Sequence, residues 1–152
     1  MSSRLFTSVR EKHGLAYFIK ASTSPYQDTG AFVVQAGLDK ARLEQAIKLV
    51  LAELKQVVDA GVTAKELADA KDFLAGKFVL DLEDCAHLAE WYGKQQLLTG
   101  KIKTPKQRLA QLRRVKLADV QRVAADVFHP ARVNLALIGP YKEEQPFLKL
   151  IS

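Results

Sequence analysis

A helical pattern gives way to a strand pattern within eight residues, Arg10-Glu11-Lys12-His13-Gly14-Leu15-Ala16-Tyr17. Before the glycine, apolar side chains recur at the spacing of one helix face, at Leu5, Phe6 and Val9. Glycine often ends a helix because it adopts left-handed backbone angles at little cost. The junction therefore predicts Arg10 in the last helical turn and Tyr17 three residues beyond the turn. Both side chains are hydrogen-bond donors, and the guanidinium is always charged.

Two strands are expected after this junction. Alternation from 15 to 21 predicts one strand with Leu15, Tyr17, Ile19 and Ala21 on one face and Phe18 on the other. Residues 22–30 are rich in turn-forming types. A second alternating run covers 31–37. Together these runs predict an antiparallel hairpin with a long loop.

The rest of the chain is mainly helical in pattern. After Gly37 the apolar period changes to that of a helix, and start and stop signals divide the sequence. Helices are expected at about 39–60, from 63, 84–99, from 104 and 118–128, followed by one strand at 133–138 and a short tail. The fold class is α+β, an antiparallel sheet with helices packed on one face. Three strands make a thin sheet, so we expect it to be incomplete, or to be extended by another chain along an exposed edge.

The bulk composition fits one soluble globular domain. The chain has 152 residues, of which 48% are hydrophobic and 26% charged, and a net charge of +6. No apolar run reaches the length of a membrane span, and the N-terminus lacks the pattern of a signal peptide. The densest basic region, 101–116, reads as an amphipathic helix with a solvated basic face. It has no interleaved aromatic residues for base stacking. We therefore expect no nucleic-acid partner, whereas an acidic protein partner would suit this surface.

The residues of this chain do not form a complete set for catalysis. His87-Leu88-Ala89-Glu90 approaches a helical zinc motif, but Trp91 stands where a second histidine is needed. His13 and His129 lie at expected helix ends, where they would cap carbonyls or interact with the helix dipole. The single cysteine, Cys85, is expected to be a small buried apolar residue, and glycine-rich phosphate loops are absent. We expect no metal and no other cofactor in this chain.

Several short motifs, in order along nearly the whole chain, resemble the pitrilysin/insulinase-type zinc metallopeptidases. This inverzincin family includes the mitochondrial processing peptidase. The similar segments are Ser2–Phe6, Arg10–Tyr17, Tyr26–Phe32 with Ala36-Gly37, Gly61–Thr63 with Glu66-Leu67 and Ala70-Lys71, Asp119-Val120 with Val123-Ala124, and Leu137–Pro140. The resemblance implies a half-clam architecture of two similar lobes, of which one carries the zinc motif H-x-x-E-H. Residues 1–152 resemble a single, later, zinc-free lobe. Met1 aligns with an interior position, which implies a lobe truncated at its N-terminus.

The resemblance also assigns roles. Arg10 and Tyr17 occupy the two positions from which the zinc-free lobe serves the active site in trans. Arg10 would hold substrate carbonyls, and Tyr17 would donate its O–H to the oxyanion. His13 stands where the family often has a second Arg. The implied function is that of a substrate-positioning lobe of a zinc endopeptidase, inactive alone, with zinc in the partner lobe or subunit.

The resemblance leaves some alternatives open. The second hypothesis is a non-catalytic scaffold or assembly subunit of the same family. The implied partners are a zinc-bearing lobe or subunit, or a second copy of the chain, and a peptide substrate. The compartment stays open, with the bacterial periplasm and cytoplasm as the leading options.

Overall fold

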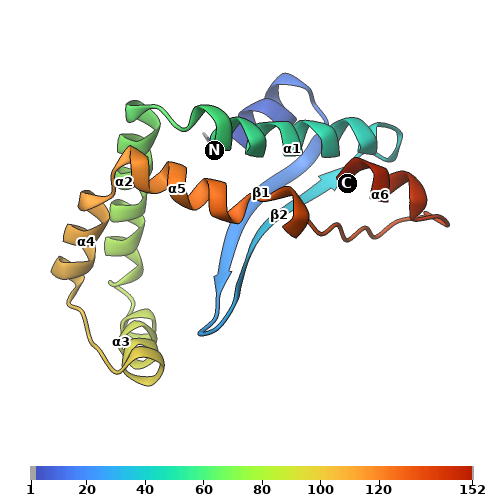
Figure 1. Cartoon of the computed structure of the whole chain (residues 1–152). Coiled ribbons are helices and arrows are strands. Elements are labelled where there is room, and N and C mark those ends of the chain that lie inside the picture. The colour runs from blue at the N-terminus through green and yellow to red at the C-terminus, as the bar shows by residue number, and fades with distance from the viewer. Residues whose placement is uncertain (1–2, 152) are drawn as a thin grey trace. The chain divides into compact units, whose positions relative to one another are not determined.

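The computed structural model describes residues 3–151 and divides into two compact units (Figure 1). One unit comprises the chain up to Ala60 together with the part from Arg122 onward, and the other comprises Gly61–Gln121. We call them the hairpin unit and the helical unit. Met1 and Ser2, with which the family comparison begins, lie outside the described residues. The architecture is α+β, as predicted.

The helix-to-strand junction in the hairpin unit forms as the sequence predicts. The first helix is a π-helix, η1 (Phe6–Lys12), and strand β1 runs over Ala16–Pro25. Gly14 ends the helix with a φ of 58°. Its N–H donates to the Arg10 carbonyl at 3.0 Å, and the Leu15 N–H donates to the Val9 carbonyl at 2.9 Å. These two bonds satisfy carbonyls at the helix end and turn the chain directly into the strand.

Strand β1 pairs with β2 (Gly30–Leu38) in an antiparallel hairpin (Figure 1). The expected long loop is wrong, because pairing continues through Ser22↔Val33 to Pro25↔Gly30. Only four residues, 26–29, connect the strands, and the Tyr26 N–H donates to the Thr29 carbonyl at 2.9 Å. Cross-strand pairing overrides the turn-forming composition of residues 22–25, since Ser and Thr are tolerated where both faces are exposed.

The predicted faces of β1 are also wrong at the start of the strand. The register shifts between Ala16 and Phe18, which face Leu38 and Gly37, so that Tyr17 is the extra residue of a β-bulge. As a result Leu15, Ala16 and Ile19 are buried, while Tyr17 is exposed. A bulge shifts the two-residue period by one position, and the sequence pattern gave no sign of it.

One hydrophobic cluster joins η1, β1 and α1 (Leu43–Ala60). Its buried members are Leu5, Val9, Leu15, Ala16, Ile19 and Ala46. Helix α1 follows the 3₁₀-helix η2 (Lys40–Arg42), whose N-terminus is capped by Asp39, and it ends before Gly61 at a φ of 72°. In β2 the side chains of Phe32, Val34 and Ala36 are half-buried and alternate with exposed ones, so the helices cover one face of the hairpin.

The helical unit contains α2 (Ala64–Asp81), α3 (Cys85–Thr99) and α4 (Pro105–Arg114), followed by the start of α5 (Leu117–Val127). Both predicted capping boxes are present, Thr63 with Glu66 and Thr104 with Gln107. Asp84 caps α3, and Gly100 ends it at a φ of 62°. Local signals therefore predicted this unit almost residue by residue.

The predicted third strand does not form. Residues 133–138 are extended, and Val133, Leu135 and Leu137 alternate with exposed neighbours, but the described residues contain a two-stranded sheet only. A strand needs a partner backbone, which a sequence pattern cannot supply. After the 3₁₀-helix η3 (Pro130–Arg132) and this segment, the expected tail instead contains the short helix α6 (Gln145–Ile151).

Candidate functional site

Arg10 lies on the exposed side of η1, one residue after the fully buried Val9. Its guanidinium carbon sits 5.0 Å from the centroid of the Phe6 ring. A cation over an aromatic face is attracted by the ring electrons, and the ring restricts the arginine from one side. Arg10 is exposed, and the planar fork of N–H groups on a guanidinium is suited to planar acceptors.

Tyr17 lies at the bulge of β1, and the residue is 87% exposed. Bulges commonly re-aim a side chain beside an active site. The neighbouring Ala16 is 7% exposed and belongs to the core, so the backbone beneath Tyr17 is anchored while the phenol extends into solvent. Its exposed O–H can therefore donate a hydrogen bond to a ligand.

The turn between the two residues is braced from η2. Arg42 Nη2 donates to the Gly14 carbonyl at 3.0 Å, and Arg42 Nε donates to Asp39 Oδ2 at 3.2 Å. The Ala41 N–H, which donates to the Asp39 carboxylate at 3.0 Å, and then Arg42 lower the pKa of that carboxyl. Asp39 thus stays charged and orients Arg42 toward the turn.

A second contact holds the turn from within. His13 Nδ1 donates to the Ser8 carbonyl at 2.7 Å, which confirms His13 as a carbonyl cap. His129 differs from expectation, because its Nδ1 accepts from the Ala131 N–H at 3.3 Å and caps the start of η3.

Arg10 and Tyr17 are therefore held on either side of one rigid turn. Both follow directly after buried core residues, Val9 and Ala16, and both stand on an irregularity, a π-helix and a β-bulge. Such irregularities are frequent at functional sites. Within residues 3–151 no hydrogen bond or ring contact joins the two side chains to each other. Each is available to a ligand.

Two supporting residues escaped the sequence analysis. Phe6 was assigned to the apolar face, although its spacing of four from Arg10 could have indicated the stacking contact. Arg42 lies 28 residues from Gly14 in sequence, and no local pattern predicts that contact.

The residues with metal-binding chemistry do not converge. Among residues 3–151, no group of three or more His, Cys, Asp or Glu side chains could hold a metal ion. The described residues of this chain therefore do not fit a zinc site, and whether the chain carries zinc stays a prediction. Cys85 was expected to be buried but is exposed, because it begins α3 at the first helical position. Within residues 3–151 no helix is both long and apolar enough to cross a membrane.

Comparison with known proteins identifies the family. The model of the Peptidase M16 inactive domain matches residues 1–74. An uncharacterized zinc protease of Streptomyces coelicolor is 40% identical over 145 residues, 95% of this chain and 31% of the relative. Another from Bacillus subtilis is 36% identical over 140 residues, 92% of this chain and 34% of the relative. A third, from Mycobacterium tuberculosis, is 33% identical over 141 residues, 93% of this chain and 32% of the relative.

The chain spans about a third of the length of the curated relatives it matches. The relatives are named zinc proteases, and the matched family model describes an inactive domain. Both agree with the resemblance to pitrilysin/insulinase-type peptidases and with a lobe that is not itself the catalytic one. The chain therefore belongs to the M16 peptidase family and is similar to the inactive domain of that family.

Proposed function

We propose that this chain is the substrate-positioning lobe of a zinc-dependent endopeptidase whose metal lies in another lobe or subunit. The observation that carries the proposal is the braced turn at Gly14, which leaves Arg10 and Tyr17 exposed on rigid backbone. A positioning lobe needs donors that are fixed before the substrate arrives, because ordering them later would cost conformational entropy.

Arg10 is proposed to bind backbone carbonyls of the peptide substrate. A guanidinium has five N–H donors in a fixed plane and can bind two acceptors at once. Stacking on Phe6 limits the orientations of this plane. This role is uniform binding, so it acts on substrate affinity more than on the chemical step.

Tyr17 is proposed to donate its O–H to the oxyanion that develops at the scissile carbonyl. A donor placed where negative charge develops stabilises the transition state more than the bound substrate. The exposure of the phenol fits a group that reaches across to an active site supplied by another lobe or subunit.

The test is cleavage of a quenched fluorescent peptide library by the chain co-expressed with its zinc-bearing counterpart. For Tyr17→Phe we expect kcat to fall by about 10²–10³ with little change in KM, the loss typical of one oxyanion donor. For Arg10→Ala we expect mainly a rise in KM, with partial rescue by Arg10→Lys.

The controls are Tyr26→Phe, which removes the hydroxyl group of an exposed tyrosine in the hairpin loop, and Arg122→Ala, which removes an exposed guanidinium from α5. Both should retain full cleavage. If Arg10→Ala and Tyr17→Phe also retain it while the paired complex still forms, the assigned roles are wrong. The alternative, a scaffold or assembly subunit of the same family, then takes their place.

A further inference from the structure

The positive charge of this protein is concentrated in one part of the helical unit. Residues 91–118 contain eight Lys and Arg residues and no Asp or Glu, whereas the remaining residues contain 15 basic and 17 acidic ones. The net charge of +6 therefore originates entirely from this part. An unbalanced charge of this size creates a local field that attracts an oppositely charged partner.

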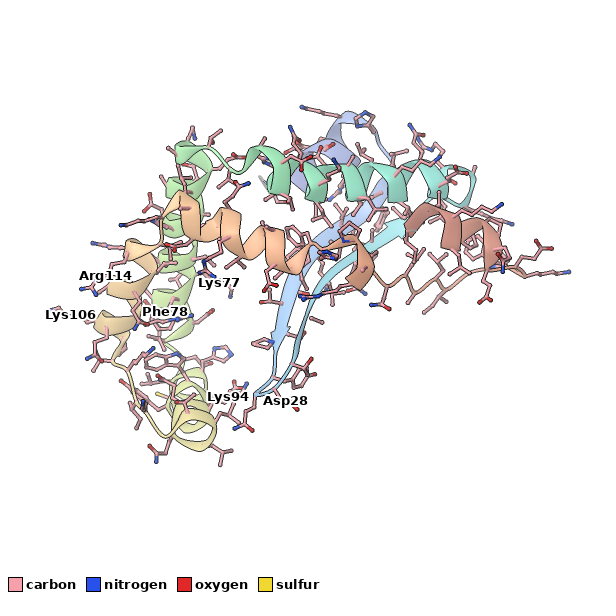
Figure 2. All side chains as sticks on the ribbon, viewed as in Figure 1. Asp28, Lys77, Phe78, Lys94, Lys106 and Arg114 are labelled. Atoms are coloured by element: carbon pink, nitrogen blue, oxygen red, sulfur yellow. The ribbon has the colours of Figure 1, made fainter. Side chains whose placement is uncertain are left out.

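Ion pairs neutralise several lysines of α1, α2 and α3, among them Lys94, which pairs with Glu90, whereas α4 contains no acidic residue that could pair with its own cations. In α1 and α2, four lysines pair with an acid four residues away: Lys48–Glu44, Lys55–Asp59, Lys65–Asp69 and Lys77–Asp81. In the described structure no ion pair involves the basic side chains of α4. Figure 2 shows two of them, Lys106 and Arg114, pointing away from α2. These cations have their full charge available to a partner.

Exposed apolar side chains lie directly beside this charge, where α3 connects to α4. Leu97 is 83% exposed, Leu98 50% and Ile102 53%. Lys101 and Lys103 flank Ile102, and Lys106 follows in the first turn of α4; all three are exposed. We call these six residues, 97, 98, 101, 102, 103 and 106, the connector patch.

The backbone of the connector patch is fixed. The Lys103 N–H donates to Gln95 Oε1 of α3 at 3.0 Å, and the Lys101 N–H donates to the Thr99 hydroxyl at 3.3 Å. On the other side, Lys103 Nζ donates to Gln111 Oε1 of α4 at 3.3 Å. The connector is thus tied to both helices, and its apolar and basic side chains are displayed on an ordered surface. A preorganised surface loses little entropy on binding.

We infer that the connector patch binds an acidic polypeptide segment that carries apolar side chains. The lysines supply charge complementarity and steer the encounter, while Leu97 and Ile102 supply apolar area that such a segment can cover. Nucleic acid fits less well, since residues 97–116, which include the connector patch and α4, contain no aromatic rings for base stacking. Exposed leucines also make no favourable contact with phosphates. This inference goes beyond the proposed function and does not depend on the Arg10–Tyr17 pair.

The test is fluorescence anisotropy of the whole chain with four labelled probes of equal length. The first is a peptide of alternating Glu and Leu or Phe. In the second Gln replaces Glu, in the third Ser replaces the apolar residues, and the fourth is single-stranded DNA. We expect the first probe to bind most tightly and to weaken as salt rises, because exposed charges are screened.

Two pairs of substitutions locate the site. Lys101→Glu with Lys106→Glu should weaken the first probe by about tenfold, since each exposed charge contact contributes a few-fold and reversal adds repulsion. Glu at position 106 lies in the first turn of α4, where the helix dipole favours it, so folding is preserved. Leu97→Ser with Ile102→Ser should weaken the same probe by several-fold even at high salt, because both side chains are already exposed.

The matched control is Lys20→Glu with Lys142→Glu, which reverses two exposed lysines of the hairpin unit and should leave binding unchanged. The inference is overturned if DNA binds more tightly than the first probe, if the two patch pairs change affinity no more than the control, or if sedimentation shows that the patch pairs instead dissolve a dimer of the chain.

Discussion

The hairpin unit and the helical unit are stabilised by different interactions. Every buried apolar side chain in the described structure belongs to the hairpin unit, in the cluster around Val9, Leu15, Ile19 and Ala46 and in its neighbours. In the helical unit only Gly61 is buried, and large side chains such as Phe73, Leu80 and Leu97 are exposed. The hairpin unit is therefore held by tertiary packing, and the helical unit mainly by local helix signals.

The helical unit does have contacts between its helices. Phe78 of α2 meets Trp91 of α3 edge to face, with ring centroids 5.4 Å apart. Lys71 Nζ donates to the Arg113 carbonyl at 3.0 Å, at the end of α4. These contacts are half-exposed, so each contributes less than the burial of a core side chain. The candidate site therefore lies in the unit whose side chains are most buried. The basic surface lies in the unit whose helices are stabilised mainly by caps and other local interactions.

The largest effect should come from truncating the core of the hairpin unit. Leu15 is 2% exposed, and Leu15→Ala should lower the free energy of unfolding by about 3 kcal/mol, within the range for buried leucines. The matched change in the helical unit, Leu97→Ala, should cost under about 0.5 kcal/mol because the side chain is already in solvent. Urea denaturation followed by circular dichroism measures both. Equal costs would contradict the comparison.

The second effect concerns the backbone of the Gly14 turn. A Cβ at Gly14 meets no atom within 4 Å, but the φ of 58° is left-handed. Gly14→Ala should therefore destabilise by about 1 kcal/mol from backbone strain alone. Gly76 lies inside α2, also in open space, so Gly76→Ala should stabilise by about 0.5–1 kcal/mol. Urea denaturation measures both variants. If Gly14→Ala and Gly76→Ala change the free energy of unfolding in the same direction, the backbone angle φ does not determine the effect of these substitutions.

A third effect, of similar size, tests whether helix capping stabilises the helical unit. Thr104 accepts from the Gln107 N–H at 3.3 Å in the capping box of α4. Thr104→Ala should cost about 1 kcal/mol, seen as faster amide exchange within 105–114. Thr104→Ser keeps the hydroxyl and is the control. Unchanged exchange in the alanine variant would mean that packing, rather than capping, holds α4.

The smallest effect is a pH dependence at the Gly14 turn. The pKa of Asp39 is lowered in the folded state by the Ala41 N–H and by Arg42. Its contribution to stability is therefore present above the ordinary pKa of aspartate and is lost as pH falls through the lowered value. Amide exchange at Leu15 should quicken as the solution is acidified through this range, after correction for intrinsic rates. Asp39→Asn should flatten that response, and an equal response in both proteins would rule Asp39 out.

The sequence pattern predicted the local features of this structure better than the features that depend on contacts between distant segments. The boxes at Thr63 and Thr104 and the stops at Gly14, Gly61 and Gly100 could be predicted because capping and left-handed glycine depend on a few adjacent residues. The third strand could not, because residues 133–138 have the right alternation but no partner in the two-stranded sheet. The burial of Cys85 was wrong for a related reason, since α3 lies where little packs on its first turn.

The sequence by itself determined the α+β class and the helix-to-strand junction, because both depend on period, composition and spacing along the chain. The resemblance to a peptidase family, which is also read from the sequence, implied the roles of Arg10 and Tyr17, and these roles stay a proposal. Only the tertiary structure decided which way Tyr17 points, since a bulge arises from how β1 registers on β2. It also decided what holds the turn, because Arg42 reaches Gly14 across 28 residues. Contacts between distant segments depend on the packed core that brings them together, and no local pattern encodes that distance.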